Sequence, residues 1–280
     1  MSLSKNSSQD SWRIKRVPSR KRIAQTGSKE LVKAWLGGDW DAIQGAYFDS
    51  WSQEKHVIDW FEMPKHWSRV RSMDWGYARP FSIHWWAISD GSTVSYNGTK
   101  INFPKGAMIC YREWYGMEKH KPNVGLRLNN DLIAKGIIER EAQGEIKDAV
   151  LDPACWKQEG GESISEQFFD HGIGKNGYRM FRRADNARIP GWQQVRYRLQ
   201  NNLLFVMKHC INLIRTIPVM QHDNTNYEDL DTDLEDHAVD DMRYACMSRP
   251  IIISRAEVEP MRIKPIPADF LKEIQGNGNR

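Results

Sequence analysis

Three apolar segments in the first half of the chain carry the pattern of β-strands. Residues 67–75, 80–89 and 107–114 place apolar and aromatic side chains with a period close to two. A short turn containing glycine joins the first two segments, and an insertion over residues 90–106 precedes the third. This arrangement constrains the fold strongly, because three such segments in succession predict an antiparallel meander.

Helical periodicity then alternates with short apolar runs in the second half of the chain. We expect helices over residues 123–143, 164–170, 192–199, 209–217 and 236–248, and strands over residues 148–152, 178–181 and 203–207. The expected fold class is α/β. A mixed sheet would combine the antiparallel meander with later parallel strands that alternate with helices, and helices would cover both faces.

The ends of the chain differ from its centre in composition. Residues 1–27 are rich in Ser, Lys and Arg, and we interpret them as a flexible basic segment. Residues 28–62 begin with a helical pattern too short to fold alone. Residues 63–250 form the expected compact domain, and residues 251–280 a proline-containing tail.

Charge and cysteine content narrow the function classes only modestly. The net charge is +4, whereas residues 223–241 contain nine acidic residues and neither Lys nor Arg. Cys110, Cys155, Cys210 and Cys246 lack the spacing of a zinc site, so we expect buried, reduced thiols in a cytoplasmic protein. The sequence contains no signal peptide and no apolar run long enough to cross a bilayer.

Three aspartates occupy positions from which they can meet in space. Asp74 ends the first expected strand, Asp152 ends the strand at 148–152, and Asp240 lies on the last expected helix. Carboxylates from separate elements can hold divalent metal ions for phosphodiester hydrolysis. Turn formation or surface charge explains each aspartate equally well when it is taken alone.

The last helix leaves its own ligand open. Its apolar stripe places Asp240 nearly opposite the core-facing side and Asp241 at the border of that stripe. His237 lies three residues before Asp240 and shares its face, so it can ligate metal or orient water, or simply face solvent.

Five segments, taken in order, resemble the C-terminal nuclease domain of the large terminase subunit of tailed bacteriophages. They are GSKELVKAWLGGDWDAIQGAYFDSW, SMDWGYARPFSIHWWA, DAVLDPACW, RRADNARIPGWQQVRYRL and DHAVDDMRYA. The resemblance covers roughly residues 28–250. The first segment is similar to the end of the family's ATPase domain, and the last is similar to its closing Asp-His-x-x-Asp-x-x-Arg-Tyr pattern.

The resemblance implies an RNase H-like fold and a metal-dependent DNA endonuclease that cuts concatemeric phage DNA during genome packaging. Carried over by position, Asp74, Asp152 and Asp240 are the implied catalytic metal ligands for two Mg²⁺ or Mn²⁺ ions. His237 and Asp241 stay auxiliary candidates. The implied partners are double-stranded DNA, the portal protein and the small terminase subunit, in the cytoplasm of the bacterial host.

The sequence departs from the family in one respect. The full-length subunit carries an ATP-driven motor, and this chain has no G-x-x-x-x-G-K-[ST] phosphate loop. We therefore expect neither ATP hydrolysis nor DNA translocation from this chain.

Basic residues after the second aspartate are candidates for contact with DNA phosphates. They are Lys157, Lys175, Arg182, Arg183, Arg188 and Arg196. Each could also be an ordinary surface charge. No helix-turn-helix or zinc-finger pattern is present, so base-specific recognition is not expected.

Two other functions remain compatible with the sequence. One is a stand-alone RNase H-like resolvase or recombination nuclease, which would favour branched DNA over linear duplex. The other is a non-catalytic docking module of the packaging motor, in which the acidic residues would serve solubility.

Overall fold

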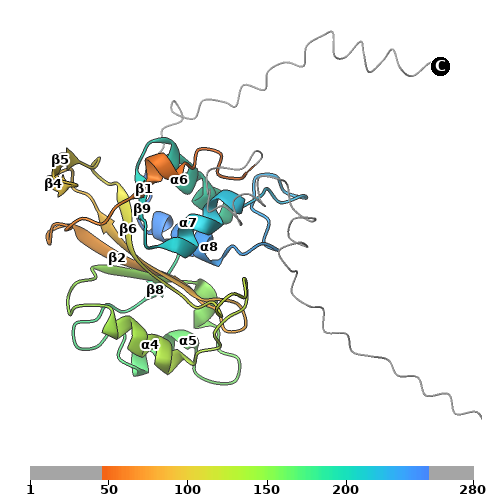
Figure 1. The fold of residues 1–280 in the computed structure, drawn as a ribbon. Coiled ribbons are helices and arrows are strands. Elements are labelled where there is room, and N and C mark those ends of the chain that lie inside the picture. The colour runs from red at the N-terminus through yellow and green to blue at the C-terminus, as the bar shows by residue number, and fades with distance from the viewer. Residues whose placement is uncertain (1–45, 252–280) are drawn as a thin grey trace, which may run out of the picture. The chain divides into compact units, whose positions relative to one another are not determined.

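A computed structural model describes residues 46–251, and a seven-stranded mixed sheet forms its centre (Figure 1). The strand order is β1-β9-β6-β3-β2-β7-β8. The strands are β1 (Val57–Ile58), β2 (Ser68–Asp74), β3 (Ser82–Ile88), β6 (Met108–Tyr115), β7 (Asp148–Leu151), β8 (Arg182–Arg183) and β9 (Leu204–Met207). The predicted basic segment 1–27, residues 28–45 of the predicted linker 28–62, and residues 252–280 of the predicted tail 251–280 lie outside the described residues.

The predicted antiparallel meander is present as β2, β3 and β6. β2 pairs antiparallel with β3 from Ser68 opposite Ile88 to Asp74 opposite Ser82, and β3 pairs antiparallel with β6. Six of the seven residues of β3 are buried. Because both faces of this central strand are covered, its sequence is almost continuously apolar rather than strictly alternating.

The insertion between β3 and β6 forms a hairpin that the sequence analysis did not assign. Strands β4 (Thr93–Tyr96) and β5 (Thr99–Asn102) pair in a separate two-stranded sheet. Asn97 and Gly98 make the turn with φ angles of 47° and 78°. Two residues with positive φ are what a tight two-residue hairpin turn requires, so the Asn-Gly pair was the available signal.

Of the later strands, β7 and β9 were predicted and add to the sheet in parallel; β1 and β8 do so as well, although no strand was predicted at their positions. β7 pairs with β2, β8 with β7, β9 with β6, and β1 with β9, all in parallel orientation. The strand predicted over residues 178–181 is wrong, because the chain pairs only at Arg182–Arg183. Aromatic and apolar residues at 178–181 suggested a strand, but the edge pairing begins where the chain reaches β7.

Helices cover both faces of the sheet, as expected (Figure 1). α4 (Asn130–Glu139) and α5 (Ile164–Asp170) lie on one side; α6 (Arg188–Gln200), α7 (Ile211–Thr216) and α8 (His237–Ser248) lie on the other. A short helix, α3 (Gln53–His56), precedes β1, and 3₁₀ turns occupy Pro153–Trp156 and Ile217–Val219. The second turn contains Pro218, the residue expected to end α7.

Capping explains why one helix matches its predicted bounds, and backbone conformation explains why another is shorter than predicted. Ser163 and Glu166 form a reciprocal capping box at the start of α5, whose bounds agree with the predicted 164–170. The helix predicted over 123–143 is much shorter. Asn123 and Arg127 have φ angles of 61° and 56°, which right-handed helix excludes, so α4 begins only at Asn130.

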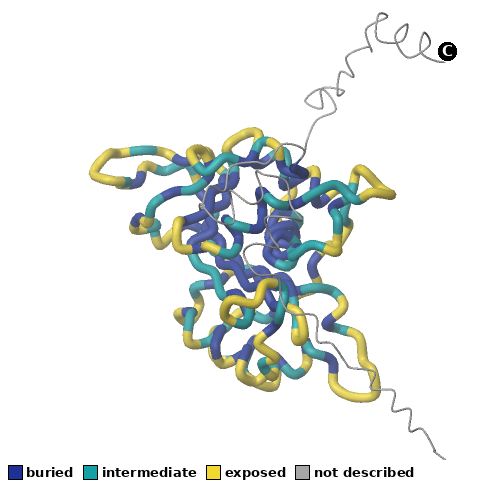
Figure 2. Tube along the Cα trace, turned by 45° about the vertical axis from the view of Figure 1, so that its right-hand side comes forward, coloured by how far each residue is buried: buried dark blue, intermediate teal, exposed yellow. Residues whose placement is uncertain are grey.

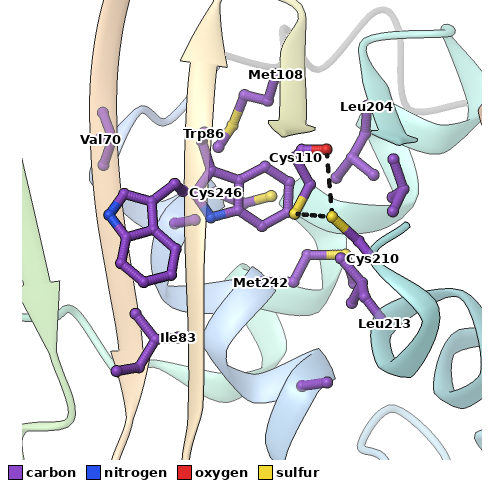
Figure 3. Close-up of a cluster of buried hydrophobic side chains, with 14 of the residues drawn as sticks. Val70, Ile83, Trp86, Met108, Cys110, Leu204, Cys210, Leu213, Met242 and Cys246 are labelled. Atoms are coloured by element: carbon purple, nitrogen blue, oxygen red, sulfur yellow. Dashed lines mark hydrogen bonds between the residues drawn. The ribbon is translucent and has the colours of Figure 1, made fainter. Parts of the chain in front are cut away.

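The core between the sheet and α7–α8 is apolar and rich in sulfur (Figure 3). Trp86 of β3 lies beside Met242 and Cys246 of α8, and all three are fully buried. The sulfur atoms of Cys110 and Cys210 are 3.7 Å apart. All four cysteines are free and buried, which agrees with the expected reduced thiols. Burial follows the strands and the inner helix faces, and exposure is concentrated in loops (Figure 2).

Residues 46–62, the described part of the predicted helical linker, join the same core. Tyr47, Phe48 and Trp51 are each at most 2% exposed, and the amide of Tyr47 donates to the carbonyl of Met220 at 2.8 Å. Strand β1 then extends the sheet beyond β9. The compact unit that contains these residues ends at Arg249.

A buried ion pair ties the sheet to the end of α4. Arg71 of β2 and Glu141 are both almost inaccessible, and Nη1 of Arg71 donates to the two carboxylate oxygens of Glu141 at 2.7 and 2.8 Å. Nη2 of Arg71 donates to the carbonyl of Arg179, and the indole of Trp85 donates to Glu141 at 2.7 Å. The charges are therefore compensated inside the protein rather than by water.

We expect Glu141→Ala to lower the free energy of unfolding by about 3–5 kcal/mol, because it leaves the guanidinium of Arg71 buried without a counter-ion. Urea unfolding of the two proteins measures the difference. Glu139→Ala is the matched control, since the Glu139 side chain is 59% exposed and lies 4.0 Å from Lys135. That control should hardly change stability. Equal losses in both variants would contradict the role of the buried pair.

Candidate functional site

The first aspartate lies at the end of the central strand β2. Asp74 is the last residue of β2, pairs with Ser82 of β3, and is only 8% exposed. The chain turns sharply after Asp74 and brings the carbonyl oxygens of Arg79 and Pro80 close to Gly76. A Cβ at position 76 would lie 2.6 Å from both oxygens, so the turn needs glycine there. Asp74 is thus held on a rigid strand end, where a close turn keeps the backbone compact.

The second aspartate reaches the same edge through the parallel strand β7. Met73 of β2 pairs with Leu151 of β7, so the next residue of each strand is an aspartate. The amide of Asp152 donates to the carbonyl of Met73 at 3.1 Å. The Asp152 carboxylate accepts from the amide of Ala154 at 3.0 Å and caps the following 3₁₀ turn.

The first turn of α8 brings His237 and Asp240 to this edge. Nδ1 of His237 lies 3.2 Å from a carboxylate oxygen of Asp74, and its Nε2 lies 3.0 Å from the side-chain oxygen of Asn123. Burial alone would lower the pKa of His237, but its contacts with Asp74 and the nearby acids raise it above its usual value. In the imidazolium form, Nδ1 donates a hydrogen bond to Asp74 and Nε2 donates one to Asn123.

The three carboxylates act electrostatically on the same buried groups. Burial raises the pKa of Asp74 to about 7; the charges of Asp240 and Asp152 add to the rise, and His237 opposes it. Burial also raises the pKa of Tyr244, and the charges of the same three aspartates raise it further. Negative charge is concentrated at this edge of the sheet, where a cation would be stabilised.

Asp240 is engaged by two arginines. Nε and Nη2 of Arg243 lie 2.9 and 2.8 Å from one of its oxygens, and Nη1 of Arg188 lies 3.6 Å from the other. Within residues 46–251, no three His, Cys, Asp or Glu side chains are gathered closely enough to hold a metal ion. The donor set suits a hard divalent cation in kind, but guanidiniums surround its third member.

The structure separates Asp240 from Asp241, which the helical pattern left open. Asp241 is fully buried, and one of its oxygens lies 2.6 Å from Nδ1 of His84 and 3.0 Å from the hydroxyl of Ser82. Nε2 of His84 in turn lies 3.3 Å from Glu113 of β6. Asp241 therefore anchors α8 on β3 and faces away from solvent, whereas Asp240 belongs to the carboxylate edge.

A groove beside Asp152 offers room for a ligand. It measures about 500 Å³ and is lined by Trp75, Asp152, Lys157 and Glu162, among others, with Gly160 and Gly161 in its wall. The indole of Trp75 donates to Asn130 at 2.9 Å, so its orientation is fixed from α4. Of the three aspartates, only Asp152 lines this groove.

The predicted DNA-contacting residues divide into two groups. Lys157 and Arg183 are exposed, and neither forms an ion pair with an acidic side chain in the described part of the chain. The other four are engaged by protein groups: Lys175 with Asp170, Arg182 with Asp148, Arg188 with Asp229 and Asp240, and Arg196 with the ring of Tyr47.

Several residues at the site were not identified from the sequence. Arg243 follows Asp240 by three positions, a spacing at which side chains on a helix meet, so this pair was detectable. Asp236, whose pKa burial and Asp240 raise to about 6, lay within the acidic run. Asn123 gave no signal, because its contact with His237 joins residues 114 positions apart.

The acids thus lie at the end of a mixed sheet covered by helices on both faces, and the fold has solved counterparts. The nuclease domain of the P22 large terminase matches with a TM-score of 0.54 at 16% identity, over 73% of this chain and 92% of that one. A large terminase from a thermophilic bacteriophage matches with a TM-score of 0.53 at 16% identity, over 80% of this chain and 52% of that one.

These neighbours establish the fold. The chain has the RNase H-like fold of large-terminase nuclease domains, which confirms the predicted fold class and the resemblance stated from the sequence. It spans about half the length of the thermophilic-phage terminase. No protein-family model and no curated protein matches the sequence. Among the described helices, none combines the length and apolar composition needed to cross a membrane.

The anchoring of α8 through His84 predicts a pH-dependent stability. Burial would lower the pKa of His84, but Asp241 and Glu113 raise it from 6.5 to about 10. A raised folded-state pKa means that the contribution of the imidazolium is complete below the ordinary pKa of histidine and is lost as pH rises through the folded-state pKa. Urea unfolding measured from pH 6.5 to about pH 10 should show a larger loss of unfolding free energy for the wild type than for His84→Gln. An equal pH dependence of stability in the two proteins would contradict a charged His84 in the folded state.

Proposed function

We propose that this chain is a divalent-metal-dependent DNA endonuclease of the terminase large-subunit type, which cuts concatemeric phage DNA during genome packaging. The proposal is supported by the fold, which matches terminase nuclease domains, and by the electrostatic effect of Asp152 and Asp240 on the buried Asp74 at the end of β2. Carboxylates delivered from two strand ends and one helix are the donor set that phosphodiester hydrolysis with two metal ions requires.

The chain's own residues divide the tasks at this edge. Asp74 is the proposed central ligand, because it ends β2, which lies inside the sheet between β3 and β7. Asp152 and Asp240 complete the proposed set for Mg²⁺ or Mn²⁺. The protonated Nδ1 of His237 donates a hydrogen bond to one oxygen of Asp74, which orients the carboxylate. The chemistry that bound divalent cations supply in such sites is activation of water and stabilisation of the leaving oxygen.

The proposed substrate is double-stranded DNA, held through its phosphates. Arg183 of β8 pairs in register with Leu151, the residue before Asp152, and its guanidinium lies over the ring of Trp156. Lys157 follows the 3₁₀ turn that Asp152 caps. Lys157 is therefore near Asp152 along the chain, and Arg183 is near it on the neighbouring strand. They are the two exposed members of the predicted basic set that pair with no acidic side chain among the described residues.

The proposal extends to the biological setting of the matched proteins. A terminase role implies association with the portal protein and the small terminase subunit in the host cytoplasm. The chain contains no phosphate loop, so ATP hydrolysis is no part of the proposed activity. A resolvase would instead prefer branched DNA, and a docking module would not cut DNA at all, so cleavage of plasmid and of branched DNA separates the three functions.

Asp74→Asn should reduce plasmid cleavage by at least about a hundredfold, because metal-assisted stabilisation of the transition state is worth several kcal/mol. Cleavage is measured on supercoiled plasmid with Mn²⁺, with Mg²⁺ and with EDTA, and the wild type should be inactive with EDTA. The variant should be at least as stable as the wild type, since a buried carboxylate is replaced by a neutral amide.

Asp233→Asn is the matched control for this experiment. It makes the same chemical change at an exposed acid in the acidic run of residues 223–241. It should cut as the wild type does. Retained Mn²⁺-dependent nicking by Asp74→Asn would refute the central role of Asp74. Wild-type protein that cuts neither plasmid nor branched DNA under any metal condition would favour the docking module.

Lys157→Ala and Arg183→Ala should each weaken duplex binding at low salt. Each lost phosphate contact should make the slope of log K against log salt less negative by about 0.9. Fluorescence anisotropy with labelled duplexes of different sequence provides the measurement, and the effect should be the same for all sequences. Lys135→Ala on α4 is the control, since Lys135 is 72% exposed and sits beside Glu139. A salt-independent affinity in the wild type would argue against phosphate contacts.

A further inference from the structure

Both oxygens of Asp240 face arginines, and the two arginines are held very differently. Arg243 is 2% exposed, and it packs against α6 where the helix has Gly191. A Cβ at Gly191 would lie 2.6 Å from Cγ of Arg243, so the glycine makes room for this side chain. Arg243 is therefore fixed beside Asp240 by packing as well as by charge.

Arg188 bridges two acids, Asp229 and Asp240, and its contact with Asp240 is the looser of the two. Its Nε lies 2.9 Å from both carboxylate oxygens of Asp229, and its Nη2 donates to the carbonyl of Leu230 at 3.3 Å. Asp229 is itself held by the indole of Trp192 at 2.8 Å. The contact of Arg188 with Asp240, at 3.6 Å, is the longest of these, and the side chain is 29% exposed.

The position of Arg188 conflicts with a divalent cation at Asp240. Its guanidinium carries a full positive charge at any physiological pH, and a cation bound to the same carboxylate would be repelled by it. The hydrogen bonds of Arg188 to Asp229 are made by Nε and do not involve Nη1, the atom that faces Asp240. Arg243 pairs with Asp240 and with no second carboxylate among the described residues.

We propose that Arg188 is a charge-balancing residue: it neutralises Asp240 in the resting site and withdraws toward Asp229 when a divalent cation binds there. The inference rests on the proposed nuclease function. It gives Arg188 a role at the carboxylate edge in place of the phosphate contact expected from sequence.

The inference makes opposite predictions for the two ends of the bridge. Arg188→Gln removes the competing charge, so Mn²⁺ affinity should rise by about tenfold, a typical effect of one nearby charge in a partly buried site. Asp229→Asn removes the acid toward which Arg188 withdraws. Arg188 should then pair with Asp240 alone and compete more strongly with the cation, so Mn²⁺ affinity should fall. The double variant should behave like Arg188→Gln.

Mn²⁺ binding to the full chain, without DNA, can be measured by electron paramagnetic resonance and by calorimetry. Arg196→Gln is the matched control, because Arg196 lies on the same helix and contacts the ring of Tyr47 instead of the acids. It should leave Mn²⁺ affinity unchanged. Thermal unfolding of each variant without metal checks that the fold is retained.

The outcomes separate this inference from the proposed function. Tighter binding by Arg188→Gln together with weaker binding by Asp229→Asn supports the bridge. A shift of both variants in the same direction, or no tightening in Arg188→Gln while the wild type binds Mn²⁺, overturns the bridge and leaves the nuclease proposal standing. Absence of Mn²⁺ binding in the wild type and in every variant would overturn both.

Discussion

The parallel pairing of β2 with β7 is the constraint on which the candidate site depends. Parallel neighbours end at the same edge of a sheet, and the register of Met73 with Leu151 makes Asp74 and Asp152 the next residues of their strands. A slip of one residue would turn every side chain of β7 to the other face. Because Ala149, Val150 and Leu151 are completely buried, the core fixes this register and thereby sets the spacing of the two acids.

The rotation of α8 is the second constraint, and buried charge sets it. Asp241 contacts His84 inside the protein, and His84 contacts Glu113, whose carboxylate also accepts the amides of Asn212 and Leu213 at the start of α7. Burying ions is unfavourable unless partners compensate them. Since this network has one good geometry, it orients the helix, and the residue before Asp241 is then directed to the edge of the sheet.

Acids gathered at one edge repel each other, and the protein supplies the cations that relieve the repulsion. Among the acids of residues 223–241, Glu235 pairs with Arg215, Asp229 with Arg188, and Asp240 with Arg243. All three arginines come from helices on the same side of the sheet. The acidic run is thus neither a simple solvated face nor a bare metal site. Part of its charge is compensated by these arginines inside the protein.

The sequence alone determined the elements whose signals are local: the meander strands, β7, the capped helix α5 and the helix α8, together with the order of Asp74, Asp152 and Asp240 along them. It did not determine the choice between Asp240 and Asp241, or the partners of Arg71, Arg188 and His237. Periodicity and capping depend on residues a few positions apart, so one sequence reveals them. Contacts such as that between Arg71 and Glu141, 70 residues apart, exist only once sheet register and helix rotation are fixed, and those are decided by the packing of the whole core.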